Sequence, residues 1–336
     1  MPIIAADGQA GTILLDWNES PFGPPPAAIE RIRAHAHEVH RYPRGLLESV
    51  TARLAAHYGV DADSVLLTGG VDEAIDLVLT SAGAAWYVTP GFDGYLSRAR
   101  VLGRTPRPLE LDADWQPRTA PADVAAGGVV FLAQPHNPTG NLFRREWIHE
   151  VADAAELMLL DTTYADFATA PVVTLDGHRN VVRFHSFSKV YGLAGIRLGA
   201  LIGAPDLIAT LRGWQRFQSV DSIALHAVDG ALDDQDYLRR FRTHVLAARP
   251  RYVAELAAQP VFTEVRDTHT NFVVACCGNA LSAAEVADRL LQHGVRVRHC
   301  DVLGLPGWLR VTVGTADDLA ATTHALSTLD PQPAAL

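Results

Sequence analysis

The sequence predicts an α/β fold, with a doubly wound, mostly parallel sheet followed by a smaller α+β domain. Between about residues 65 and 205, short apolar runs alternate with amphipathic stretches, as in parallel strands joined by helices. After Asp221 the strands are fewer, and a long helical stretch precedes them. The chain has 336 residues, of which 48% are hydrophobic, so it can bury a core of this size.

In the first part, short apolar runs predict strands at 65–68, 86–89, 129–133, 157–161, 181–185 and 199–202. Amphipathic stretches between them predict helices at 72–79, 94–102, 144–155 and 206–217. Such sheets bind ligands at the carboxyl ends of their strands, where the chemically suggestive residues of this chain fall.

In the second part, helical spacing runs to about Leu256, and Pro250 predicts a break. Strands are expected at 261–265, 271–275, 295–298 and 309–313. A helix is expected from Ser282, a favourable N-cap, to His293. Residues 17–26 are rich in Pro and Gly, which predicts a loop at the small domain or the cleft.

Charge and composition exclude several classes of protein. The net charge of -10, with scattered basic residues, argues against nucleic acid or an anionic membrane as the main partner. No apolar run reaches the roughly 18 residues of a membrane span, and no signal segment is evident, so we expect a cytoplasmic protein. Cys276, Cys277 and Cys300 form no disulfide framework, which fits a reducing compartment.

Three of the histidines, His35, His37 and His40, lie close together in the sequence. On a helix His35 and His37 point about 200° apart, so only His37 and His40 share a face. Zinc needs three or four converging ligands, and no third ligand is evident nearby. We therefore expect a solvated helix face and no metal.

Lys189 lies in a segment, residues 186–199, that combines hydroxyls, an amine, glycines and an arginine. Strand-like runs flank this segment, which places Lys189 on a turn. An amine there can form a Schiff base with a cofactor aldehyde such as that of pyridoxal phosphate (PLP). Ser186, Ser188 and Arg197 can then hold the phosphate. The alternative is a surface lysine beside a Gly-rich turn, which so short a motif cannot exclude.

Asp161 closes an apolar strand and would be a buried carboxylate in need of a cation. The pyridinium nitrogen of PLP is such a cation, and keeping it protonated makes the ring an electron sink. Alternatively, Asp161 caps a turn with Thr162 and Thr163.

Two further segments fit the same cofactor. Asn137, on a rigid turn after a strand, and Tyr164 could donate to the phenolate oxygen of the ring, although Asn-Pro-Thr-Gly is also an ordinary turn. A Gly69-Gly70 pair precedes a helix start, whose first backbone N–H groups make an anion site for phosphate.

In this order the segments resemble the class I/II aminotransferases of PLP fold type I, and most closely the histidinol-phosphate aminotransferase branch. Residues 15–24, LDWNESPFGP, are similar to that branch's L-N-x-N-E-N-P-x-G-P opening and are followed by Arg-Tyr-Pro. Residues 70–73 match its G-[AS]-D-E except at Val71, and residues 309–315 match its L-R-[IV]-[ST]-[VI]-G-T. The resemblance covers residues 15–315.

The resemblance implies a large domain with a seven-stranded sheet at residues 39–240, a small domain at 241–336, and an N-terminal segment, 1–38, that joins the small domain and the cleft. It implies that Lys189 binds PLP covalently and moves the proton, Asp161 pairs with the pyridinium, and Phe92 stacks on the ring. Tyr164 and Asn137 would contact the ring oxygen. The phosphate would be held by Gly70, Val71, Asp72, Ser186, Ser188, Arg197 and, from a partner subunit, Tyr42. A homodimer with shared active sites follows.

Substrate residues are expected at Arg310, which would hold a carboxylate or phosphate, at Arg298 near the distal group, and at Asn18. Ser20 replaces a larger Asn or Tyr and would reshape the pocket mouth. Asp221 stands in a segment that lacks the family's proline. A carboxylate there would repel a phosphomonoester and favour a cationic substrate, unless Asp221 is a helix N-cap.

The sequence thus predicts a PLP-dependent aminotransferase that moves an amino group between an amino-acid donor and a 2-oxo acid or related carbonyl. Histidinol phosphate is the substrate that the resemblance implies. Alternatives are an aromatic amino acid or a specialised one, cationic amino acids included, in secondary metabolism, or decarboxylation or elimination on the same cofactor. A PLP-sensing module of a transcription regulator is disfavoured by the acidic chain and the few residues before Leu15.

Overall fold

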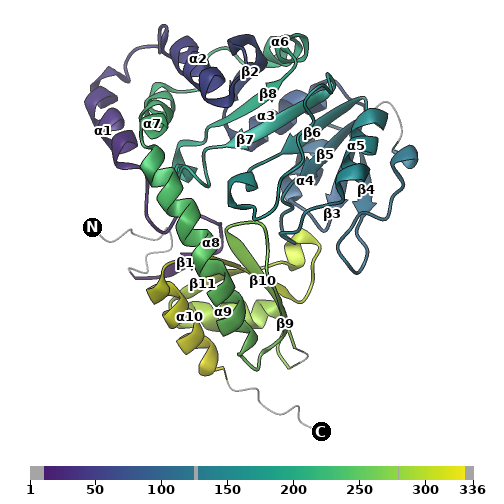
Figure 1. Ribbon diagram of the computed structural model, residues 1–336, viewed down its shortest axis with the longest axis vertical. Helices are drawn as coiled ribbons and strands as arrows, with labels where there is room; N and C mark the ends of the chain where they lie inside the picture. Colours follow the sequence, from purple (N-terminus) through teal and green to yellow (C-terminus); the bar gives the residue numbers. More distant parts are fainter. Residues whose placement is uncertain (1–10, 125–127, 279, 330–336) are drawn as a thin grey trace.

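The computed structural model describes residues 11–124, 128–278 and 280–329. Among these residues the strands form a seven-stranded sheet and a five-stranded sheet, joined by the long helix α8 (Figure 1). The helices are α1 (Pro26–His35), α2 (Leu46–Tyr58), α3 (Gly70–Thr80), α4 (Asp93–Val101), α5 (Arg145–Ala154), α6 (Pro205–Trp214), α7 (Ser222–Asp233), α8 (Gln235–Ala257), α9 (Ala283–Gln292) and α10 (Ala316–Ser327).

The larger sheet has the strand order β2-β8-β7-β6-β5-β3-β4. Strand β8 runs antiparallel to both of its neighbours, and the strands from β7 to β4 are parallel to one another. The expectation of a mostly parallel α/β sheet is confirmed. The strands are β2 (Val65–Thr68), β3 (Ala84–Thr89), β4 (Thr105–Glu110), β5 (Gly128–Ala133), β6 (Leu157–Asp161), β7 (Val181–Ser186) and β8 (Gly199–Gly203).

Helices cover both faces of this sheet, which explains why its central strands are apolar throughout. Along β5, Val129 and Phe131 pack with α3, α4 and α6 on one face. Val130 and Leu132 point to the other face and pack with α2, α5, α7 and α8. Successive side chains of a strand alternate between faces, so a strand covered on both faces needs an uninterrupted apolar run.

The smaller sheet has the order β1-β11-β12-β10-β9 and includes a strand from the start of the chain. Strand β1 (Ile13–Leu15) lies parallel to β11 (Val295–His299), which brings the residues after Leu15 beside β12 (Trp308–Thr312). The sheet is completed by β10 (Phe272–Cys277) and β9 (Phe262–Arg266). Ser282 caps α9 as expected, in a reciprocal capping box with Glu285.

The structure contains two strands that the sequence analysis does not predict, β4 and β1. Strand β4 contains Pro106 and Pro108, which argue against a strand interior, but β4 is the edge strand of its sheet, where a missing N–H is tolerated. Strand β1 has only three residues, too few for a recognisable pattern.

The expected helix break near Pro250 is wrong. Helix α8 continues through Pro250, and the chain breaks instead at Asp234, whose side chain accepts a hydrogen bond from the Tyr237 N–H and starts α8. Because α8 spans residue 240, the change from one core to the other occurs inside this helix. Phe241 and Val245 pack in the core of the larger sheet, and Tyr252 and Leu256 pack in the core of the smaller one. We propose that the domain boundary lies in this part of α8.

The N-terminal segment of the described chain also serves both parts. Strand β1 belongs to the smaller sheet, whereas α1 packs against α7 beside the larger sheet (Figure 1). None of the helices in the described residues is long and apolar enough to cross a membrane.

Candidate active site

A cavity of about 570 Å³ lies where three parallel strands end. Ala133, Asp161 and Ser186, the last residues of β5, β6 and β7, all line it. The walls include Trp17, Asn18, Glu19, Val71, Phe92, Tyr95, Asn137, Thr163, Tyr164, Ser188, Lys189, Arg197, Arg298 and Arg310. Asp161, Asn137 and Lys189, which the sequence analysis singled out, therefore lie together at the carboxyl ends of strands, as expected.

Lys189 lies on the turn between β7 and β8, and its amine reaches the cavity. Its side chain is half-buried, and Nζ donates a hydrogen bond of 2.6 Å to the Trp17 carbonyl oxygen. Burial, together with the nearby Arg310 and Arg197 charges, lowers the pKa of Lys189 to about 7, and Glu19 and Asp161 oppose this shift. A substantial share of this amine is therefore neutral and nucleophilic at neutral pH.

Asp161 is a buried carboxylate without a salt bridge to any of the described residues. It is 7% exposed. The Tyr95 hydroxyl donates to Oδ2 over 2.8 Å, and the Thr163 backbone N–H donates to Oδ1 over 2.9 Å. Burial raises the pKa of the Asp161 carboxyl, against the lowering effect of the bonds from Thr163 and Tyr95. The alternative role of Asp161, capping a turn with Thr163, is therefore observed. A cationic nitrogen of a ligand would in addition stabilise the buried carboxylate.

Asn137 and Tyr164 each accept a hydrogen bond from a neighbouring side chain, so their own N–H and O–H protons remain free to donate. Arg310 Nη1 donates to Asn137 Oδ1 over 2.7 Å, and because arginine can only donate, the amide NH₂ of Asn137 faces elsewhere. The Asn18 amide donates to the Tyr164 hydroxyl oxygen over 2.9 Å. Both groups can therefore donate to an oxygen atom in the cavity.

The anion-binding end of the cavity forms where α3 begins. Gly70 has a φ of +78°, and a Cβ built on it would lie 3.1 Å from Arg197 Nη2, so the backbone and the guanidinium are close. Arg197 also lies 3.4 Å from the Asp72 carboxylate. Val71, Ser186, Ser188 and Arg197 line the cavity on this side. Backbone N–H groups, hydroxyls and a guanidinium together suit a phosphate.

Five predicted site residues do not line the cavity: Gly70 and Asp72 flank the lining residue Val71, and the other three lie elsewhere. The Asp221 side chain caps α7 by accepting from the Ala224 N–H over 2.8 Å, and it does not line the cavity. The N-cap alternative is thus the observed one, and Asp221 gives no reason to expect a cationic substrate. Ser20 bonds to the Tyr237 hydroxyl over 2.7 Å and also lies outside the lining, so it does not shape the pocket mouth as expected. Tyr42 is 72% exposed and away from the cavity of its own chain.

Sequence reasoning missed Tyr95, the partner of Asp161, and the lining residue Glu19. Tyr95 lies three residues after Phe92, hence on the same side of the α4 helix start, which is the signal that could have identified it.

A count of residue types gives a further reason to assign the aldehyde-binding role to Lys189. Lys189 is the only lysine in the chain, against 27 arginines, which leaves no other side-chain amine to hold an aldehyde.

Comparison with known proteins agrees with the fold and the cavity. The family model "Aminotransferase class I and II" matches residues 10–326. The chain is 36% identical over 343 residues to histidinol-phosphate aminotransferase of Halobacterium salinarum, covering 95% of this chain and 90% of that protein. It is 33% identical over 331 residues to the enzyme of the same name from Symbiobacterium thermophilum, covering 95% and 91%.

Among solved structures, histidinol-phosphate aminotransferase from Sinorhizobium meliloti in complex with pyridoxal-5'-phosphate superposes with a TM-score of 0.83. It shares 24% identity, over 97% of this chain and 94% of that one. Fold and cavity define an enzyme of PLP fold type I. The chain belongs to the class I and II aminotransferases, and PLP is its cofactor. Its substrates are small molecules that exchange an amino group for an oxo group.

The cavity fits this cofactor. It contains the single lysine amine of the chain, a buried carboxylate without a salt bridge, two oriented donors, and an anion-binding end at α3. These are the groups that an aldehyde, a pyridinium, a ring oxygen and a phosphate require.

Proposed function

We propose that the protein transfers an amino group between histidinol phosphate and a 2-oxo acid, using Lys189 as the residue that binds PLP. PLP, when bound, supplies the aldehyde that takes up the amino group and a ring that delocalises the electrons of the broken substrate C–H bond. Asp161 would hold the ring nitrogen in its protonated form. Asn137 and Tyr164 would donate to the ring oxygen, and Phe92 would stack on the ring.

At the phosphate of PLP, the Val71 and Asp72 N–H groups at the start of α3 would act with Ser186, Ser188 and Arg197. Gly70 would allow the phosphate to approach closely, because a Cβ at this position would lie 3.1 Å from Arg197 Nη2.

Lys189 would also move the proton between substrate carbon and cofactor. A base for this step needs a neutral amine near the working pH, and the pKa of about 7 for Lys189 supports that role. Glu19 and Asp161 tend to keep the amine protonated, while burial and Arg310 tend to remove its proton. The balance allows Nζ both to accept and to return a proton.

The observation that carries the substrate proposal is the pair of arginines in the cavity. Arg298 and Arg310 are opposite each other on β11 and β12. Arg310 Nε is buried and has no hydrogen-bond partner among the described residues. A guanidinium pairs well with a phosphate or carboxylate, so the cavity supplies cationic donors beside Lys189 for a phosphomonoester. Glu19 is a candidate acceptor for the imidazole N–H.

The test compares histidinol phosphate, histidinol and phenylalanine as amino donors, by the loss of the PLP absorbance band in the half-reaction. We expect kcat/KM to be highest for histidinol phosphate. Arg298→Gln should lower that value by about tenfold or more, since a hydrogen bond to a charged group contributes about 1.5–3 kcal/mol. The same substitution should change the value for histidinol little.

Arg100→Gln is the matched control, because Arg100 is an exposed arginine that does not line the cavity. Equal use of histidinol and histidinol phosphate by the unaltered enzyme would contradict the substrate proposal and leave the aminotransferase activity intact.

We further propose a homodimer in which Tyr42 reaches the phosphate site of the partner. Exposed apolar side chains on this chain support an interface: Val39, three residues before Tyr42, is 60% exposed, and Phe217 is 89% exposed. Light scattering would give the mass, and Tyr42→Phe should weaken PLP binding without changing the mass. A monomer at micromolar concentration would contradict the dimer. The three free cysteines support the cytoplasm as the site of action.

A further inference from the structure

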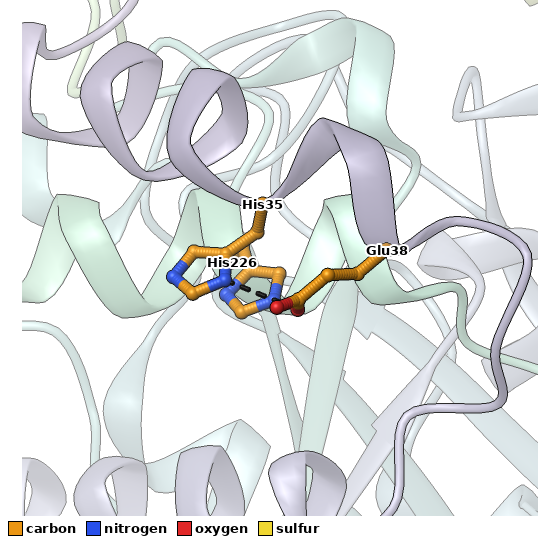
Figure 2. A group of neighbouring side chains, drawn as sticks. All are labelled: His35, Glu38 and His226. Atoms are coloured by element: carbon orange, nitrogen blue, oxygen red, sulfur yellow. Dashed lines mark hydrogen bonds and ion pairs between the residues drawn. The ribbon is translucent and has the colours of Figure 1, made fainter.

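Away from the active-site cavity, His35, Glu38 and His226 bring three possible metal ligands together (Figure 2). His35 ends α1, Glu38 ends the short turn η1 (Ala36–Glu38), and His226 projects from α7. Their ligand atoms all lie within 4.8 Å of one another. The spacing of His35, His37 and His40 does not reveal this group, because its third member comes from a distant helix.

The distances are close to those that zinc requires. Zinc is bound by nitrogen and oxygen at about 2.0–2.2 Å in a tetrahedron, so its ligand atoms lie about 3.3 Å apart. Glu38 Oε2 lies 3.1 Å from His35 Nδ1 and 3.9 Å from His226 Nε2. The first separation is about 0.2 Å shorter and the second about 0.6 Å longer than this value, differences that side-chain rotations can supply.

His226 is a buried histidine whose hydrogen bonds are not satisfied within the described chain. Its side chain is 8% exposed. Nδ1 is buried without a partner, and Nε2 is 3.9 Å from Glu38, outside hydrogen-bond range. An ion bound among the three residues would give Nε2, the nitrogen that lies nearest to Glu38, the partner that it lacks.

The two imidazole rings are stacked, with centroids 3.9 Å apart and planes 4° apart. An ion bound in the plane of one ring cannot lie in the plane of a parallel ring, so one ring must turn. His35 is able to do so, since 32% of its side chain is exposed, while His226 is enclosed. His37, at 75% exposure and 3.8 Å from Glu38 Oε1, is available as a fourth ligand.

The surrounding charge does not oppose a cation strongly. The positive charge of Arg31 acts on His226, but Arg31 Nη1 lies 2.8 Å from Asp229 and its Nη2 lies 3.0 Å from Asp233. Arg53 pairs with the same two carboxylates, so two positive charges face two negative ones. Glu38 then adds one negative charge at the group itself.

We propose that His35, Glu38 and His226 form a binding site for a divalent transition-metal ion of the zinc class. Two imidazoles and a carboxylate form a usual zinc ligand set, completed by water or by His37. The ion would connect the end of α1 to α7. It would thereby fix the backbone that leads from η1 into the exposed segment at residues 39–45.

The experiment is a calorimetric titration of Zn²⁺ into the PLP-loaded protein without an affinity tag. We expect one ion per chain. His35→Gln and Glu38→Gln should each weaken the affinity by about 100-fold, since even the loss of an outer partner of a metal ligand costs 10- to 100-fold. Both residues are partly exposed, so these variants should fold.

His226→Gln should have the same effect, and His324→Gln is the matched control, because His324 is an exposed histidine on α10. Thermal unfolding in Zn²⁺ gives a second readout, with a rise in Tm for the unaltered protein and the control variant alone. Absence of Zn²⁺ binding would overturn the proposal, as would binding that is unchanged in His35→Gln and Glu38→Gln. If His226→Gln does not fold, the two exposed variants decide the matter.

Discussion

Gly192, three residues after Lys189, is a position where a single methyl group should disturb the active-site turn. Its φ is +64°, and its N–H donates to the Lys189 carbonyl oxygen over 2.8 Å. A Cβ built there would lie 2.3 Å from the Tyr237 hydroxyl oxygen and 2.8 Å from the Gly23 carbonyl oxygen. Gly192→Ala must therefore both hold alanine in the left-handed region and displace Tyr237.

The expected loss has two parts. The left-handed backbone costs alanine roughly 1–2 kcal/mol. The Tyr237 hydroxyl bonds to Ser20 and to the Gly23 carbonyl oxygen, and losing both bonds costs about 1–3 kcal/mol at 0.5–1.5 each. The free energy of unfolding should thus fall by about 2–5 kcal/mol. The same turn carries Lys189, so PLP should also dissociate more readily.

Urea unfolding of the PLP-free protein, followed by tryptophan fluorescence, measures this loss. Gly213→Ala is the matched control, because Gly213 lies in α6 with nothing within 4 Å of its built Cβ, and it should be neutral or stabilising by up to about 1 kcal/mol. In a Tyr237→Phe background the cost of Gly192→Ala should fall by about 1–3 kcal/mol, since the displaced hydroxyl is gone. An undiminished cost in that background would refute the reasoning, as would a loss below about 0.5 kcal/mol in the unaltered chain.

Three further predictions follow from the structure. Tyr95→Phe should weaken PLP binding by up to about tenfold, because the Tyr95 hydroxyl donates to Asp161, and a hydrogen bond to a charged acceptor contributes about 1.5 kcal/mol more than one to a neutral acceptor. Equilibrium dialysis measures the affinity for PLP, and the effect should disappear in an Asp161→Asn background. In the PLP-free protein, acetylation of Lys189 should speed up as pH rises and reach half its maximal rate near pH 7, because only the neutral amine reacts and burial lowers its pKa to about 7. Peptide mass spectrometry measures the rate, and a midpoint near the ordinary value of 10.5 would contradict a lowered pKa of Lys189. Ser282→Ala should lower the free energy of unfolding by about 1 kcal/mol through loss of the α9 capping box. Ser327→Ala is the control, because Ser327 is the last residue of α10 and caps no helix N-terminus.

The parts of the fold that follow from local pattern were predictable from sequence. The apolar runs that become β5 and β6 are buried on both faces, so nothing interrupts them. The Ser282 cap is a local motif. Pro250 misled the prediction because its removed N–H affects one hydrogen bond, which the packing of Tyr252 and Leu256 outweighs in a long helix.

The cofactor residues were predictable to the extent that a strand end or a turn carries them. Asp161 is the last residue of its strand, Asn137 and Lys189 follow the ends of theirs, and parallel strands bring their carboxyl ends together. Contacts that depend on tertiary packing were not visible. Asp221 could be judged a cap only once its distance to the Ala224 N–H was known. His226 on α7 meets His35 and Glu38 near the end of α1, and Tyr95 on α4 meets Asp161 at the end of β6; no short motif records either contact.

The most direct test of the central claim uses the fact that the chain has one lysine. Borohydride reduction of the PLP-loaded protein fixes the cofactor on the amine that holds it, and mass spectrometry locates the added mass. We predict one added pyridoxyl group per chain, on the peptide that contains Lys189. Prior addition of histidinol phosphate should remove it, and Lys189→Ala should carry none there. A label on the N-terminal amine alone, or a Lys189→Ala variant that still transfers amino groups at an undiminished rate, would contradict the account.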